Sequence, residues 1–214
     1  MKTTLNTYSG NALIISCALL LITMGLHPTG GSLEHIRHAI PMIITSHSIA
    51  LLAIPVLLTG FLGLTKLLKQ GSQIAELGFF FMAFALVGGM CAAALNGIVL
   101  PLTLNKFDHA TGDELHFLTT ILSYNSSINQ AFDFIFIGGA VCATACWSLT
   151  IIITGLLPKW IGYTGLALVL IALMPVFPNM AIVQLLGFRL FILGFSIWTI
   201  AIGVLIKRSP IANP

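Results

Sequence analysis

The residues best suited to chemistry lie in segment 25–48, GLHPTGGSLEHIRHAIPMIITSHS, which holds four of the six histidines of the chain. Glu34 and His38 are four residues apart, so their side chains would share one face of a helix that begins after a Ser32 cap. Imidazole and carboxylate groups together suit zinc, copper and other transition metals. The candidate metal ligands are His27, Glu34, His38 and His47.

The metal hypothesis has a geometric difficulty. No compact motif such as HExxH is present, and His47 lies on nearly the opposite face of an ideal helix from His38. One ion would bind both only if Pro41 kinks the helix between them. A b-type haem held by His27 and His47 is a less favoured alternative, because no second pair of axial ligands is present.

Three more polar side chains, Asn96, Asp133 and Arg189, interrupt apolar runs. Charged residues inside a membrane are costly and usually pair in the bundle interior, so Asp133 and Arg189 are predicted to form an ion pair. At about 1.5 Å per residue, His47, Asn96 and Arg189 each lie roughly 27 to 30 Å from the charged residue at the far end of their helix. Asp133 is predicted at a similar or somewhat higher level, so these four residues form a candidate ligand-binding layer.

The composition indicates an integral membrane protein, so transmembrane helices must position the polar residues of the candidate layer. Of 214 residues, 57% are hydrophobic and 7% are charged, with a mean hydropathy of +1.04, whereas about a quarter of residues in a soluble domain are charged. A bilayer span needs roughly 20 apolar residues. The six candidate spans, in a single all-α domain over residues 1–214, are 11–26, 39–68, 74–102, 128–157, 160–174 and 181–206.

Basic residues at the ends of the spans predict an orientation. Six spans place both termini on one side, and positive charge concentrates on the cytoplasmic side of membrane proteins. The side of the termini carries Lys2, Lys66, Lys69, Lys159, Lys207 and Arg208, whereas the opposite side carries Arg37, Lys106 and Arg189. Both termini are therefore predicted to be cytoplasmic, with every histidine on or near the outer face.

The one long connection, 103–127, is predicted to contain a short amphipathic helix. Residues 111–114, TGDE, have capping-box spacing, and Leu115, Leu118 and Leu122 follow at helical intervals. This helix would lie over the outer mouth of the bundle, either as a lid or as a surface helix that only covers it.

Other patterns concern packing and partners. Gly89, Ala93 and Gly97 form a row of small residues at four-residue spacing, which is typical of close helix contacts in membranes. The four cysteines lie inside apolar runs and predict no disulfide. Basic residues are scattered rather than clustered, so no nucleic-acid partner is expected and the predicted environment is the lipid bilayer.

Short motifs resemble a group of small bacterial six-helix membrane proteins of unknown function. The matching segments are the HPTG turn at 27–30, His47, residues 96–101 (NGIVLP) and the turn LPKWIG at 157–162. The resemblance implies a six-helix fold in the bacterial inner membrane and supplies no activity.

Three functional interpretations remain open at this level. The first is a pocket, facing outward, that binds a metal ion or a small polar ligand. The second is an enzyme that acts on a lipid or amphiphile at the outer leaflet, with Asp133 and His47 as acid and base. The third is a structural or accessory subunit, in which the polar layer only ties helix ends together. No catalytic residue is assigned, and an oligomer or complex partner fits all three.

Overall fold

The structure is a computed structural model that describes residues 2–28, 30–174 and 185–208. These residues form helices and connections and include no strand, which confirms the all-α prediction. The helices are α1 (Lys2–Leu26), α2 (Leu33–His38), α3 (Ile40–Leu68), α4 (Ile74–Ala94), the π-helix η1 (Leu95–Val99), α5 (Leu100–Lys106), α6 (Asp113–Thr154), α7 (Lys159–Leu173) and α8 (Leu185–Arg208).

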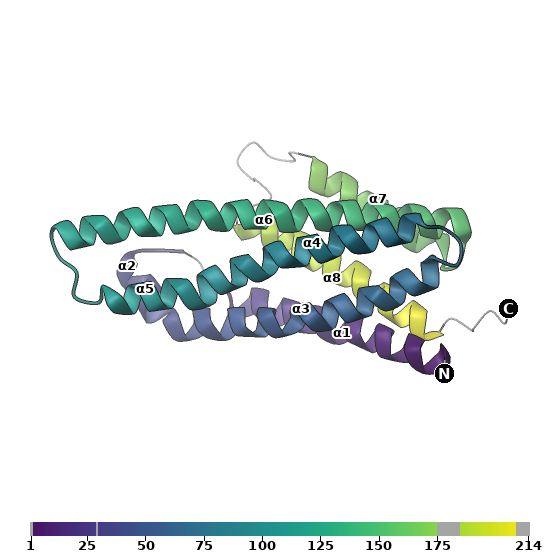
Figure 1. Ribbon diagram of the computed structural model, residues 1–214, viewed down its shortest axis with the longest axis horizontal. Coiled ribbons are helices and arrows are strands. Elements are labelled where there is room, and N and C mark those ends of the chain that lie inside the picture. Colours follow the sequence, from purple (N-terminus) through teal and green to yellow (C-terminus); the bar gives the residue numbers. More distant parts are fainter. Residues whose placement is uncertain (1, 29, 175–184, 209–214) are drawn as a thin grey trace.

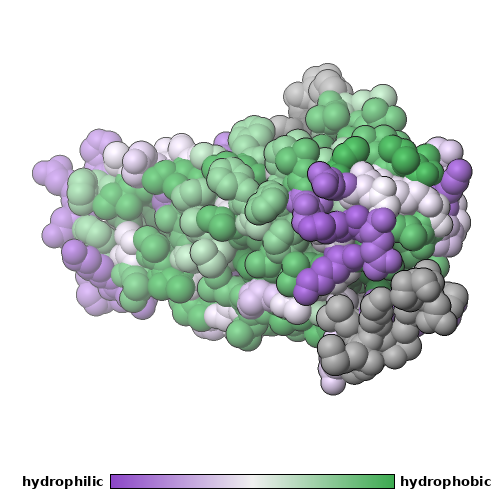
Figure 2. All heavy atoms as spheres, turned by 45° about the vertical axis from the view of Figure 1, so that its right-hand side comes forward, coloured by the Kyte–Doolittle hydropathy of each residue, from purple (hydrophilic) through white to green (hydrophobic). Residues whose placement is uncertain are grey.

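Within the described residues, five helical segments are long and apolar enough to cross a membrane. They are Asn6–Leu26, Ile40–Leu68, Ile74–Lys106, Asp113–Thr154 and Leu185–Arg208, while Lys159–Leu173 is a shorter apolar helix. The exposed flank of the bundle is largely apolar, and hydrophilic residues gather toward its two ends (Figure 2). This distribution is that of a helical bundle embedded in a membrane, because lipid replaces water as the solvent of the flank.

The six longest helices follow one another around the bundle. α1 packs against α3 and α8, α4 packs against α3 and α6, and α7 joins α6 to α8. The first residues of α1 and the last residues of α8 lie at one end, which we call the terminal end (Figure 1). α2, α5 and the start of α6 lie at the opposite end, which we call the histidine end.

Aromatic side chains fill the core near the terminal end. Trp147 and Phe195 are fully buried, and both pack on Phe61, with ring centroids 4.6 and 6.0 Å away respectively. The Trp147 Nε1–H donates to the Ala75 carbonyl at 3.1 Å, so the buried indole is satisfied. The predicted row of small residues also packs inward, since Ala93 and Gly97 are buried.

The separate outer helix predicted between the third and fourth spans is wrong. α6 is one continuous helix of 42 residues, from Asp113 to Thr154. Its sequence has neither glycine nor proline before Gly138, so nothing interrupts the backbone hydrogen bonds through the polar stretch that looked like a loop. At about 1.5 Å per residue α6 is roughly 63 Å long, more than a bilayer requires, and it extends beyond α8 at the histidine end (Figure 1).

Two local predictions fail with it. Gly112, at φ 56°, stands at the N-cap of α6 without a side-chain hydrogen bond, so the capping box does not form. Pro41 is in the first turn of α3 and does not kink the middle of a helix, because the chain already turns at Ala39 between α2 and α3.

Candidate functional site

A cavity of about 540 Å³ lies inside the half of the bundle nearest the histidine end. Its walls come from α1, α3, α4, η1, α6 and α8, together with the connection that follows α1. The polar side chains that line it are Thr23, His27, His47, Asn96, Ser126, Asn129, Gln130 and Asp133.

Polarity changes along the long axis of this cavity. On α3 the lining residues run from His47, nearest the histidine end, to Ile54 and Leu57 toward the middle of the bundle. On α6 they run from polar residues to Phe136 in the same direction. One end of the cavity is therefore polar and the other is apolar, as in sites that bind an amphiphilic molecule.

The polar end contains a pair of histidines. His27, the residue after α1, and His47 on α3 have ring centroids 5.0 Å apart with an interplanar angle of 57°. Gly97 of η1 makes room for this arrangement, because a Cβ at that position would lie 2.4 Å from the His47 Cβ. The glycine predicted as a packing residue thus positions a residue of the site.

Backbone contacts define the tautomer of both rings. The His47 Nδ1 lies 2.7 Å from the Ile43 carbonyl oxygen, and the His27 Nδ1 lies 3.0 Å from the Pro28 carbonyl oxygen. A carbonyl only accepts, so each Nδ1 carries the hydrogen and donates it, and in a neutral ring each Nε2 has a free lone pair. Within the described residues neither Nε2 has a hydrogen-bond partner.

His27 is held in the neutral form. Burial lowers its pKa from the ordinary value of 6.5, and the positive charge of Arg189 lowers it further, while the hydrogen bond to the Pro28 carbonyl acts in the opposite direction. The ring is therefore uncharged at neutral pH.

This pKa shift predicts that acid destabilises the fold. Unfolded His27 gains a proton near its usual pKa of about 6.5, whereas the folded ring resists protonation to lower pH. The stability is thus fully present above that value and is lost as pH falls through it toward the folded pKa. Melting temperatures measured from about pH 8 to about pH 5 should fall less for His27→Gln than for the parent protein. Identical profiles would contradict this assignment.

A chain of amides lies beside the histidines. Asn96 of η1 donates through Nδ2 to Asn129 Oδ1 at 2.8 Å, and Asn129 donates through Nδ2 to Asp133 Oδ2 at 2.8 Å. Asn125 lies within 3.5 Å of Asn96 Oδ1. Asn125 and Asn129 are not among the residues predicted for the site, although their four-residue spacing with Asp133 places all three on one face of α6. Asn96 lies in the π-helix η1, and a π-helical turn within an α-helix is frequent at functional sites.

The predicted ion pair between Asp133 and Arg189 is not formed. The Arg189 Nη2 donates instead to the carbonyl of His27 at 2.5 Å. α8 packs along α1, so the guanidinium reaches the end of that helix, where carbonyls lack partners within the helix and carry partial negative charge. The Arg189 Nε is buried without a partner among the described residues.

The predicted metal ligands separate into two pairs. His38 Nε2 and Glu34 Oε1 lie 4.0 Å apart on α2, with side chains 81% and 87% exposed, whereas His27 and His47 lie inside the bundle. Over the described ranges no three His, Cys, Asp or Glu side chains are placed to hold one metal ion. The metal site is therefore not supported, because one pair of the predicted ligands is exposed on α2 and the other lies inside the bundle.

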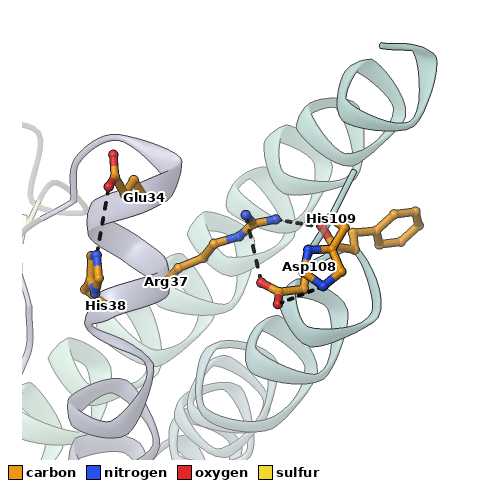
Figure 3. A network of polar contacts seen from close by, with 6 residues as sticks. Glu34, Arg37, His38, Asp108 and His109 are labelled. Carbon is orange, nitrogen blue, oxygen red and sulfur yellow. Dashed lines mark hydrogen bonds and ion pairs between the residues drawn. The ribbon is translucent and has the colours of Figure 1, made fainter. Parts of the chain in front are cut away.

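Polar contacts of Arg37 connect α2 to a neighbouring segment at the histidine end. Arg37 donates through Nη2 to the Phe107 carbonyl at 2.6 Å, and its Nη1 lies 3.9 Å from Asp108 Oδ1 (Figure 3). Asp108 also contacts His109, at 3.9 Å. These contacts attach α2 to the connection between α5 and α6, and they leave His38 facing Glu34.

His47 does not activate Ser46 as a nucleophile. The Ser46 hydroxyl donates to the Ile43 carbonyl at 3.1 Å and lies 3.2 Å from the His47 Nδ1. That ring nitrogen already donates to the same carbonyl, so it does not accept a proton from Ser46. The arrangement is suited to binding through hydrogen bonds.

No known family model, curated protein or solved structure matches this chain. The resemblance to bacterial six-helix proteins therefore stays a prediction, and the cavity is the feature that bears on function.

Proposed function

We propose that this protein binds a small amphiphilic organic molecule inside the membrane, in the cavity lined by His27, His47, Asn96 and Asp133. The observation that carries the proposal is the gradient within the cavity, whose polar groups lie at one end and whose aliphatic and aromatic groups lie at the other. A volume of about 540 Å³ falls within the range of small-molecule sites, which runs from roughly 300 to 1,000 Å³.

We further propose six membrane crossings with both termini in the cytoplasm of a bacterium, in the inner membrane. The starting end of α1 and the final end of α8 lie together (Figure 1), which favours an even number of crossings. α6 and α8 both end at the terminal end, and we propose α7, which lies between them in the chain, as the sixth crossing. Basic residues on the terminal side support the cytoplasmic assignment.

Unpaired polar atoms of the histidine pair favour binding over a purely structural role. A tie between helix ends needs its polar atoms paired with each other, because an unpaired group in an apolar interior costs about 1 to 3 kcal/mol. The two Nε2 atoms lack such partners and face a cavity. A bound molecule would supply them.

The proposal is tested by native mass spectrometry of the protein released from membranes, followed by extraction of any retained molecule. We expect one bound organic molecule per chain. His47→Ala should lose it, because the substitution keeps the Cβ beside Gly97 and removes only the imidazole.

The matched control is His109→Ala, whose side chain is 97% exposed in the connection after α5. This variant should retain the molecule. If the parent protein never holds a molecule in any preparation, and His47→Ala instead loses its cooperative melting transition, the residue serves the fold and the proposal is wrong.

A further inference from the structure

We propose that the molecule bound in this cavity carries a head group that donates hydrogen bonds, namely a hydroxyl or a protonated amine, and that anionic heads are excluded. This inference rests on the proposed function and specifies the chemical class of its ligand. Its basis is the balance of donors and acceptors at the polar end.

The histidine pair presents acceptors at that end. The backbone carbonyls of Ile43 and Pro28 hold the Nδ1 hydrogens of His47 and His27, so each ring has only an Nε2 lone pair for a ligand. The Asp133 carboxyl group adds a further acceptor. An incoming O–H or N–H group would satisfy these atoms, whereas an ether oxygen would leave them unpaired.

The other polar side chains at this end, Ser126, Asn96, Asn129 and Gln130, can accept as well as donate, so they also pair with a head group that donates. Asn96 and Asn129 each donate one amide hydrogen along the chain that ends at Asp133. Their donation is directed toward the carboxyl group of the protein, which lowers the number of hydrogens available to a ligand.

The charges at the cavity argue against an anion. Its lining includes no lysine or arginine within the described residues. The nearest cation, Arg189, is bonded to the His27 carbonyl. A carboxylate or phosphate head would enter an apolar bundle beside lone pairs and Asp133, without the cation that buried anions need.

The apolar end specifies the remainder of the ligand. Leu20, Leu57 and Leu86 line the cavity toward the middle of the bundle, and Phe136 and Ile192 extend this surface. A hydrocarbon chain fits such a wall, because it presents no polar atom to it. The ligand class is therefore a hydrocarbon chain with a hydroxyl or ammonium head.

The test uses five probes with one decyl chain: decanol, decylammonium, decyl methyl ether, decyltrimethylammonium and decanoate. Binding is measured by titration on the protein in nanodiscs, with melting temperature as a second readout. Decanol and decylammonium should bind roughly tenfold or more tightly than the other three, because each lost hydrogen bond leaves a buried acceptor unpaired. In His47→Phe and His27→Phe, which keep a ring and remove the acceptor, the preference for decanol over its methyl ether should fall toward one.

Three outcomes would overturn the inference. Equal binding of all five probes would mean that only the chain is recognised, and the proposed function would still stand. Tighter binding of decanoate would assign an anionic head, again leaving the proposed function intact. No binding of any probe would remove the inference, while retention of a native molecule in the mass spectrum would decide the proposed function separately.

Discussion

Trp147→Ala is expected to destabilise the protein by about 3 to 5 kcal/mol, the usual cost of truncating a fully buried large aromatic side chain. The indole has no exposed surface, stacks on Phe61 at 4.6 Å and donates to the Ala75 carbonyl at 3.1 Å. Gly78 sits against it, since a Cβ there would lie 2.9 Å from the Trp147 Nε1. Truncation removes contacts among α3, α4 and α6 and leaves the Ala75 carbonyl without this donor.

Melting temperature and chemical unfolding in detergent would measure this loss, with Trp160→Ala as the control. Trp160 is 53% exposed on α7, so its truncation should change the stability little. Trp147→Phe should fall between the two, because it keeps an aromatic ring and loses the hydrogen bond. Equal losses at the two tryptophans would contradict the packing described for the terminal half of the bundle.

Gly97→Ala is expected to be the most damaging single-methyl change at the site. The added Cβ would lie 2.4 Å from the His47 Cβ and 3.2 Å from its Cγ, so η1 and α3 must separate or the imidazole must turn. Overpacking of this kind typically costs about 1 to 3 kcal/mol. The shift would also move the His47 ring relative to His27, and binding of decanol should weaken roughly tenfold or more if one hydrogen bond to the ring is lost.

Gly138→Ala on α6 is the matched control, since no atom lies within 4 Å of an added Cβ there. Alanine is the better helix former by about 1 kcal/mol, so this variant should be neutral or slightly stabilised and should bind decanol normally. Normal binding and stability in Gly97→Ala would show that His47 does not depend on the close approach of η1.

Several features of the site follow from local sequence. His47, Asn96 and Asp133 line one cavity, as the count of residues along each helix predicts, because helical rise converts sequence position directly into depth. The inward packing of Gly97 follows from the row of small residues for a similar reason. These predictions need only the geometry of single helices.

Other features depend on contacts between helices. The partner of Arg189 depends on which helix lies beside α8. Charge alone predicted Asp133 as that partner, whereas in the structure Arg189 donates to the His27 carbonyl. The four predicted metal ligands fail as a group because Glu34 and His38 are exposed on α2, whereas His27 and His47 meet inside the bundle. The continuity of α6 was not predicted, because the low hydropathy of its first residues is typical of a loop.

The sequence by itself determined the all-helical class, the membrane setting and the depth of the polar residues, because apolar length and helical rise are local properties. Only the tertiary structure decided which of those residues meet: the contact between His27 and His47, the amide chain ending at Asp133, and the cavity between them. Rotation of each helix about its axis and its choice of neighbours determine these contacts. Both arise from packing over the whole bundle, and no single segment encodes them.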